Sequence, residues 1–405
     1  MRSLFLLSLV LLSACATVPT GPRDDPGVEA AMAFDRTGER GGEVRGVADP
    51  ATGRLATLDD PVRVASVSKL VVAVGVLRLV EQGRLDLDKD VSAYLGYPLR
   101  NPAFPNDPIS LRRLLSHTSG VRDYDDQYAM PLDASIQVVM ADPRSWDPQH
   151  APAENYFTYS NMNFPIVASV VERITGERFD RWMHANVLAP MRLDACFNWP
   201  TCSDAAITRA VVLTQNGKSV KDDLGGRQPA CPVSPATDGS CDLTRWEAGR
   251  NGAWFAPQGG LRISARGLTQ IGQMLLGNGT LDGVRLLSPA SVDLLLAPLW
   301  RFNGSNGETD GGFYCSYGLA SHQIATPVAG CNDDPGGDGN ALVGHAGEAY
   351  GLRSGLWIDR KAGTGIAYYR TGLAVVPTPG QTAFRAAEEA SFRRATTLLQ
   401  RSGAR

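Results

Sequence analysis

The stretch SVSKLVVAVGVLRLVEQ, residues 66–82, constrains the fold of this 405-residue chain more than any other. Its side chains are apolar on nearly all sides of a helix until the segment turns polar near its end, and Gly83 is typical of a helix terminus. A helix that is apolar all round is buried. We therefore expect residues 66–82 to form a central helix that other elements surround.

Runs typical of strands occur near both ends of the chain. Residues 31–35 and 43–47 are two short runs separated by a glycine-rich turn, and SGLWIDR and GIAYYRTG flank a turn at KAGT. Helical patterns lie mostly between them, at residues 109–115, 165–174 and 268–276, with a last one at 382–400. This order predicts an α+β fold: an antiparallel sheet built from both termini, flanked by helices, with an inserted, mainly helical subdomain and a cleft between the parts.

Length and charge narrow the class of protein. A chain of 405 residues exceeds the usual single-core limit, so we expect two domains or two subdomains that share a cleft. The 39 basic and 42 acidic residues give a net charge of −3, with no long run of one sign. The charge pattern therefore gives no reason to expect a nucleic-acid partner.

The N-terminus has the pattern of an export signal. Met1 and Arg2 precede an apolar run over residues 4–12, which is too short to span a bilayer, and small residues then lead to Cys15. Cys15 resembles the lipidated cysteine of a bacterial lipoprotein lipobox. We expect a signal peptide at 1–14, a lipid on Cys15, a flexible tether at 15–27 and one folded domain at 28–405. The alternative is a plain signal peptide that removes Cys15; the lipoprotein interpretation predicts anchoring to a membrane facing the periplasm, in particular the outer membrane.

Six cysteines follow Cys15, and export would allow them to form disulfides. Six cysteines permit fifteen connectivities. Proximity in sequence favours pairing Cys196 with Cys202, Cys231 with Cys241, and Cys315 with Cys331. The chain lacks C-x-x-C and H-E-x-x-H patterns, so we expect neither a metal nor another cofactor.

Ser66 and Lys69 are the candidate nucleophile and base. Residues three apart project from the same face of a helix. A lysine in the first turn faces the positive end of the helix dipole, and burial among Val and Leu would lower its pKa. A neutral amine beside a hydroxyl is a general base beside a nucleophile. The alternative makes Ser66 a helix N-cap and Lys69 a solvated side chain.

Two further motifs follow in order along the chain. Tyr159-Ser160-Asn161 precedes an apolar helix, where the alternative is a polar loop that caps this helix. His345-Ala346-Gly347 begins the C-terminal hairpin, where the alternative is a strand-edge histidine with a local hydrogen bond.

With Ser66-x-x-Lys69, these motifs resemble those of the serine β-lactamase and penicillin-binding protein superfamily, closest to class C β-lactamases, D-alanyl-D-alanine carboxypeptidases and related esterases. The resemblance extends over nearly the whole chain after the tether.

The resemblance implies a role for each motif. Tyr159 would transfer a proton to the leaving group, and the Asn161 amide would bind the amide of the substrate. His345 and Gly347 would lie beside the substrate, and the backbone N–H of Glu348 would join that of Ser66 in an oxyanion hole.

Ala346 departs from the superfamily pattern, since most relatives have Thr or Ser there, and that hydroxyl helps to bind a substrate carboxylate. Arg353 is the first candidate to replace it. The resemblance therefore predicts a periplasmic serine hydrolase that acts through a Ser66 acyl-enzyme on small-molecule or peptide substrates, either amides or esters. The alternative from another class is a non-catalytic receptor for cell-wall peptides or β-lactams on the same fold.

Overall fold

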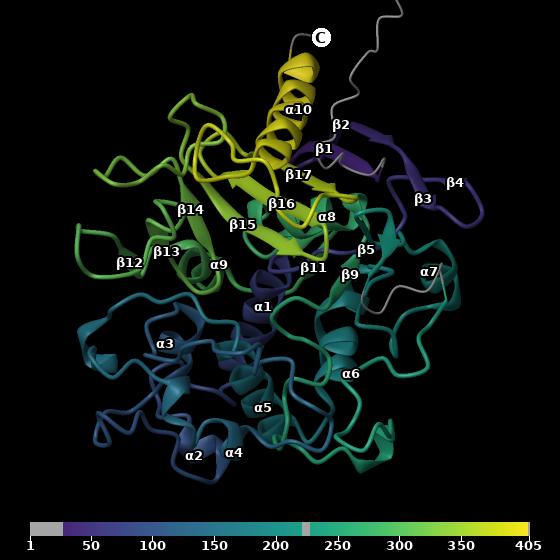
Figure 1. Cartoon of the computed structure of the whole chain (residues 1–405). Helices are drawn as coiled ribbons and strands as arrows, with labels where there is room; N and C mark the ends of the chain where they lie inside the picture. The colour runs from purple at the N-terminus through teal and green to yellow at the C-terminus, as the bar shows by residue number, and fades with distance from the viewer. Residues whose placement is uncertain (1–26, 221–226, 404–405) are drawn as a thin grey trace, which may run out of the picture.

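The computed structural model describes residues 27–220 and 227–403, which form layers around a large sheet (Figure 1). This sheet has eight strands in the order β12-β13-β14-β15-β16-β17-β1-β2, and each neighbouring pair is antiparallel. The strands are β1 (Glu29–Asp35), β2 (Gly38–Arg45), β12 (Trp300–Arg301), β13 (Ser316–Tyr317), β14 (His322–Ile324), β15 (Leu342–Ala349), β16 (Leu352–Asp359) and β17 (Thr364–Arg370). Both ends of the chain thus build one sheet, which confirms the expected α+β class.

Helices cover both faces of this sheet. Met32 and Phe34 of β1 pack in the main core on the side of α8 (Ala265–Leu276), whereas Ala31 and Ala33 pack on the side of α10 (Ala386–Gly403). Successive side chains of a strand point to opposite faces, so a strand between two helical layers is apolar throughout. This explains why β1 reads as an almost continuous apolar run.

The turn between β1 and β2 differs from the expected glycine-rich turn. The chain reverses at Arg36 and Thr37, where the Asp35 carboxylate accepts hydrogen bonds from the backbone N–H groups of Thr37 and Gly38. Gly41 and Gly42 lie inside β2 instead. At Gly42, a Cβ atom would lie 2.6 Å from the Met32 sulfur, so this glycine serves close packing between strands.

The apolar segment at residues 66–82 forms α1 (Val67–Glu81), and all but three residues of this helix are buried. It runs between the sheet and the helical part of the molecule and contacts β15, β16 and α9 (Figure 1). Gly83 follows the helix with φ of +68°, a conformation that glycine adopts without strain. The central helix was therefore predicted with the correct ends to within one residue.

The remaining helices form the inserted part of the chain, between β5 and β12. They are α2 (Ser92–Leu95), α3 (Leu111–Leu115), α4 (Ile136–Val139), α5 (Asn163–Thr175), α6 (Phe179–Met183), α7 (Asp204–Arg209) and α9 (Pro289–Leu296). A small sheet of β5 (Val62–Arg63), β9 (Leu261–Ile263) and β6 (Cys196–Phe197) lies beside the start of α1. Further two-stranded ribbons are β3 (Val47–Asp49) with β4 (Arg54–Leu55), β7 (Thr214–Gln215) with β8 (Lys218–Ser219), and β10 (Thr280–Leu281) with β11 (Val284–Arg285).

One apolar cluster joins the sheet and the inserted part. It contains Phe34 and Leu356 from the sheet, Val72 from α1, and Val167 from α5. The two parts are therefore subdomains of one core. In the described residues, no helix has the length and apolar character needed to cross a membrane. The expected signal peptide, tether and Cys15 lie outside the described residues, apart from Gly27.

Candidate active site

Ser66 is the residue immediately before α1, at the N-cap position of this helix. Its backbone is helical, with φ of −66°, and its side chain makes no capping hydrogen bond to the helix. Ala65 before it has φ of +46°, an uncommon conformation for a residue with a Cβ, and such strain is found most often at functional sites. Ser66 therefore occupies the N-cap position of α1, as the alternative has it, but its hydroxyl does not cap the helix because it has another partner.

That partner is Lys69, whose Nζ lies 2.9 Å from Ser66 Oγ. Lys69 is fully buried, and its Nζ also lies 2.8 Å from the Asn161 side-chain oxygen and 2.8 Å from the Gln258 backbone oxygen. Burial lowers the pKa of Lys69 to about 7, and the negative charge of Asp123 opposes this shift. The structure thus excludes the solvated lysine of the alternative interpretation.

Tyr159 lies beside the Ser66–Lys69 pair. Its ring centre is 5.0 Å from Lys69 Nζ, and the ring stacks on His117 at 4.3 Å and on Tyr314 at 4.7 Å. Burial raises the pKa of Tyr159, and the nearby hydroxyls of Ser66 and Tyr314 oppose the rise. Within the described chain the Tyr159 hydroxyl has no well-aligned hydrogen bond. A neutral phenol next to Ser66 is therefore free to bond to a substrate atom.

Asn161 is also at the site, where its side-chain oxygen faces Lys69. The helix that follows, α5, has Met162 at its N-cap position and no side-chain cap, so neither Asn161 nor Asn163 caps it. Two further groups at this site were not predicted from the sequence. The Gln258 carbonyl carries no side-chain signal, and Asp123, in the loop after α3, belongs to none of the three motifs.

His345 differs from its expected place beside the substrate. The imidazole is 1% exposed and is not among the residues that line the cleft. Its Nε2 lies 2.7 Å from the Tyr317 hydroxyl, and its Nδ1 is hydrogen-bonded to the Ala346 carbonyl oxygen. The carbonyl can only accept, so Nδ1 carries the proton and Nε2 accepts from Tyr317. Burial, together with the charge of Lys69, lowers the pKa of His345 well below 6.5, and the ring is neutral.

Gly347 brings β15 close to the start of α1. A Cβ atom here would lie 2.4 Å from the Val64 carbonyl oxygen and 3.2 Å from the Ser66 nitrogen, so a larger residue does not fit. Glu348 follows with an exposed side chain that forms an ion pair with Arg353. Gly347 thus lets the C-terminal end of β15 lie beside the Ser66 N–H. The oxyanion role of the Ser66 and Glu348 N–H groups stays a prediction.

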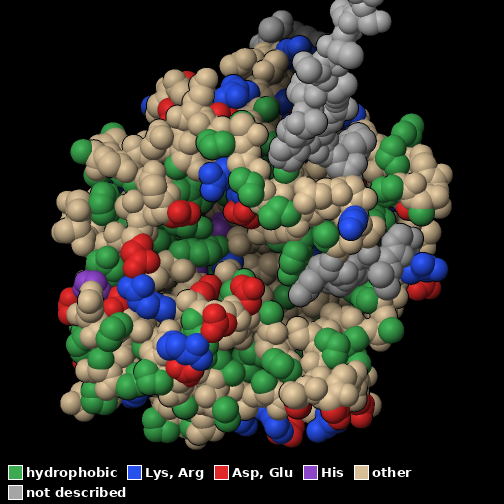
Figure 2. Space-filling model, in the orientation of Figure 1, with side chains coloured by type: hydrophobic (Ala, Val, Ile, Leu, Met, Phe, Trp, Pro, Cys, Tyr) green, Lys and Arg blue, Asp and Glu red, His purple; other side chains and the backbone are tan. Residues whose placement is uncertain are grey.

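Ser66, Tyr159 and Asn161 open into a cleft of about 790 Å³ between the sheet and the inserted part. Ala346, Gly347 and Arg353 line its sheet side. Figure 2 shows this face of the molecule hollowed near its centre, with acidic and basic side chains around the rim. The cleft is large enough for a small-molecule or short peptide substrate.

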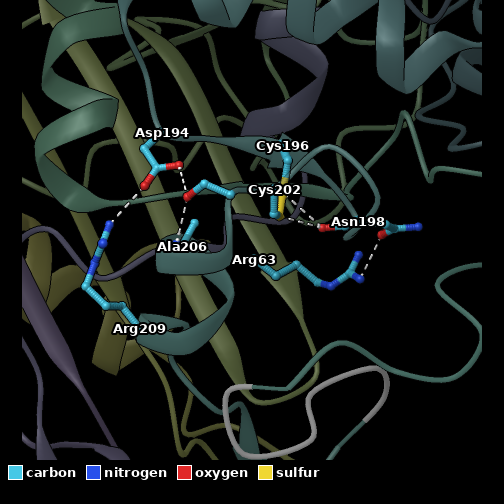
Figure 3. The surroundings of a disulfide bond; sticks show 8 residues. Arg63, Asp194, Cys196, Asn198, Cys202, Ala206 and Arg209 are labelled. Atoms are coloured by element: carbon cyan, nitrogen blue, oxygen red, sulfur yellow. Dashed lines mark hydrogen bonds and ion pairs between the residues drawn. A yellow bond between two sulfur atoms is a disulfide. The ribbon is translucent and has the colours of Figure 1, made fainter.

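Disulfides support the walls of this cleft. Beside the Cys196–Cys202 bond, the Asn198 side-chain oxygen accepts a hydrogen bond of 2.9 Å from Arg63, which lines the cleft (Figure 3). Cys231 lies in the wall itself, and Cys315 adjoins Tyr314. The structure contains all three pairings expected from proximity: Cys196–Cys202, Cys231–Cys241 and Cys315–Cys331.

Among residues 27–220 and 227–403, no group of three or more His, Cys, Asp or Glu side chains is arranged to hold a metal ion. The chemistry available at the described site is that of a hydroxyl, an amine, a phenol and backbone N–H groups.

Comparison with known proteins agrees with this arrangement. The family model "Beta-lactamase" matches residues 30–390, and the chain belongs to this family. Relatives with this fold are mostly serine hydrolases. Penicillin-binding protein 4 of Amycolatopsis lactamdurans is 28% identical over 276 residues, which cover 66% of this chain and 64% of the length of that relative.

Two solved structures illustrate the shared fold. The class C beta-lactamase from Rhodobacter sphaeroides has a TM-score of 0.65 at 16% identity, covering 92% of this chain and 95% of that one. The D-amino acid amidase from Ochrobactrum anthropi SV3, in its complex with D-phenylalanine, has a TM-score of 0.63 at 20% identity, covering 93% and 94%. At these identities the likeness establishes the fold.

Proposed function

We propose that this protein is a periplasmic serine hydrolase that transfers the acyl group of an ester or amide to Ser66 and then releases it to water. The observation that carries this proposal is the 2.9 Å contact between Ser66 Oγ and the fully buried amine of Lys69. A buried lysine with a pKa of about 7 is about half deprotonated at neutral pH, whereas an ordinary lysine is almost fully protonated there, so Lys69 is available as a base.

The partners of Lys69 determine where its lone pair points. A neutral amine has two N–H donors and one acceptor site, and this amine has three partners. The oxygens of Asn161 and Gln258 can only accept. Ser66 is the one partner with a hydrogen to donate, so the deprotonated amine accepts the Ser66 O–H bond. This is the geometry that a general base needs for its nucleophile.

The remaining groups complete an acyl-transfer cycle. Lys69 takes the Ser66 proton as Oγ attacks the substrate carbonyl carbon, and backbone N–H groups of Ser66 and Glu348 stabilise the resulting oxyanion. Tyr159 passes a proton to the leaving oxygen or nitrogen, and the C–O or C–N bond breaks. Water then attacks the acyl-enzyme, returns a proton to the site and releases the acid.

The sheet side of the cleft favours uncharged substrates. Ala346 has no hydroxyl to bind a carboxylate, and His345 is neutral and buried. Arg353 is already paired with Glu348. A charged hydrogen bond is worth roughly 1.5–3 kcal/mol, or about ten- to a hundredfold in kcat/KM. We therefore expect small neutral esters to react faster than penicillins or peptides with a free carboxylate.

The test compares kcat/KM for a p-nitrophenyl ester, a chromogenic cephalosporin and a D-alanyl-D-alanine peptide. Ala346→Thr should raise the values for the two carboxylates by roughly tenfold relative to the ester. Ala346→Val is the matched control, because it adds the same volume without the hydroxyl, and it should not narrow the gap. Fast hydrolysis of the peptide or cephalosporin by the wild type, unchanged in Ala346→Thr, would mean that Arg353 binds the carboxylate instead.

A further inference from the structure

Asp123 is hydrogen-bonded to three consecutive residues, 160–162, the first two of which belong to the second motif. Its Oδ1 accepts hydrogen bonds from the Ser160 hydroxyl at 2.7 Å and from the Met162 backbone N–H at 3.0 Å. Its Oδ2 accepts from the Asn161 backbone N–H at 2.8 Å and from the Asn161 side-chain amide at 3.1 Å. Four donors converge on one side chain, which matches the acceptor capacity of an ionised carboxylate. Asp123 therefore connects its own loop, which is 37 residues earlier in the sequence than Ser160, to the segment that begins with Tyr159.

These bonds fix the orientation of the Asn161 amide. The Nδ2 group faces the Asp123 carboxylate, which only accepts, so the Oδ1 atom must face Lys69 at 2.8 Å. The reversed amide would put an oxygen against a carboxylate and an NH2 group against the N–H bonds of Lys69. One N–H of Asn161 stays available for a substrate, since Asp123 takes the other.

The charge of Asp123 also reaches Lys69. Of the other titratable groups that face Lys69 in the described chain, the imidazoles of His117 and His345 are neutral, because burial lowers both pKa values well below 6.5. Tyr159 is a neutral phenol, because burial raises its pKa. Asp123 is the group whose charge favours the ammonium form of Lys69, against the effect of burial.

We propose that Asp123 is a positioning residue of the site: it holds residues 160–162 in place, turns the Asn161 oxygen toward Lys69, and sets the pH range over which Lys69 acts as base. This inference rests on the proposed function, in which Lys69 must be neutral to accept the Ser66 proton. Asp123 acts through Asn161 and through its charge, and it is not among the described residues that line the cleft.

Asp123→Asn tests the proposal through the pH profile of kcat/KM for a neutral p-nitrophenyl ester. Loss of the negative charge favours the neutral amine, so Lys69 stays deprotonated at lower pH. The acid limb of the profile should shift downward by roughly half a unit to one unit. The plateau should fall on the order of tenfold to a hundredfold, since the new NH2 group faces either the two N–H donors of Asn161 or the Met162 N–H and displaces them.

Two variants separate charge from structure. Ser160→Ala removes one of the four hydrogen bonds and keeps the carboxylate, so its acid limb should coincide with that of the wild type. Asp123→Glu keeps the charge but shifts the carboxylate, so its plateau should fall while its acid limb moves less than in Asp123→Asn. Thermal melts of each variant show whether the fold is intact, and Asp123→Glu carries the test if Asp123→Asn does not fold.

An acid limb in folded Asp123→Asn that coincides with the wild-type limb would overturn the proposal, as would an equal shift in Ser160→Ala. Ser66→Ala distinguishes this failure from failure of the proposed function. If Ser66→Ala is inactive and the Asp123→Asn profile is unshifted, the hydrolase assignment stands and the role of Asp123 falls. If Ser66→Ala keeps its esterase activity, the proposed function itself fails.

Discussion

Glu388 is a buried ionisable group that lines the cleft. Its side chain is 1% exposed, and one of its oxygens has no hydrogen-bond partner in the described part of the chain. Burial raises the pKa of Glu388 from 4.5 to about 8, although the charge of Arg353 opposes the rise. The carboxyl is therefore largely protonated at neutral pH, and ionising it in the folded protein costs free energy.

We predict that Glu388→Gln makes stability less dependent on pH. In the wild type the folded state binds the Glu388 proton more tightly than the unfolded state, so stability falls as pH rises from about 5 to about 8. Each pKa unit is worth about 1.4 kcal/mol, so the loss is on the order of a few kcal/mol. Urea unfolding at pH 6 and pH 9 measures it, and the Gln variant should lose less stability over this interval than the wild type.

The neighbouring Glu389 provides the control. Burial opposes ionisation there too, but hydrogen bonds from Thr382 hold the pKa of Glu389 below its usual value. Glu389→Gln should therefore lower stability by a similar amount at pH 6 and pH 9. A Glu388→Gln variant with the same loss between the two pH values as the wild type would contradict the prediction.

Site residues whose pattern is local in the sequence were predicted, and those that only the fold brings to the site were not. Ser66 and Lys69 are three apart on one helix, so the spacing alone places them on one face. The Gln258 carbonyl meets Lys69 from a turn 189 residues away, and a backbone oxygen has no sequence signature. Asp123 is one of several aspartates in loops. Only the folded structure shows which of them reaches the site. The burial of His345 follows from packing against Tyr317 and was not predicted.

The contact between α8 and the sheet depends on glycine. A Cβ atom at Gly272 of α8 would lie 2.2 Å from the ring of Phe34, and one at Gly365 of β17 would lie 2.4 Å from it. Phe34 thus fills the space between two glycines. The helix can approach β1 and β17 closely because neither position has a side chain.

We predict that Gly272→Ala destabilises the protein, although alanine favours a helix by about 1 kcal/mol over glycine. Overpacking against Phe34 costs typically 1–3 kcal/mol, which offsets or exceeds that gain. Gln270→Ala on the same helix, at a half-buried position, is the control and should change stability by less than about 0.5 kcal/mol. Chemical denaturation measures both, and a clear stabilisation by Gly272→Ala would show that the contact relaxes freely.

Elements with a strong local pattern were predicted well, and those set by side-chain contacts were not. The apolar run and the following Gly83 gave α1 its ends. The last helix was expected from Thr382 but begins at Ala386, because the N–H and hydroxyl of Thr382 bond to the Glu389 carboxylate and hold the chain in a loop. The first hairpin turn was placed too late for a related reason: Asp35 closes it with its side chain.

For the molecule as a whole, we predict that Cys15 anchors the protein to a membrane through a lipid. Membrane fractionation of the natural host, or of an expression host with lipoprotein processing, should recover the wild type with the membranes and Cys15→Ser in the soluble fraction. Cys202→Ser is the control, since it also replaces a cysteine but leaves the lipobox intact. Recovery of both Cys15→Ser and the wild type in the soluble fraction would contradict the prediction.

Acylation of Ser66 is the central claim, and its direct test is the intact mass of the protein over time after mixing with p-nitrophenyl acetate. The account predicts one acetyl group per protein, located by peptide mapping on Ser66, that forms rapidly and disappears as the ester is consumed. Ser66→Ala and Lys69→Ala should each lose on the order of 10⁴ to 10⁶ in turnover, and the double variant should lose no more than either. An acetyl group that persists on Ser66 would indicate a receptor, and turnover by Ser66→Ala at the wild-type rate would contradict the account.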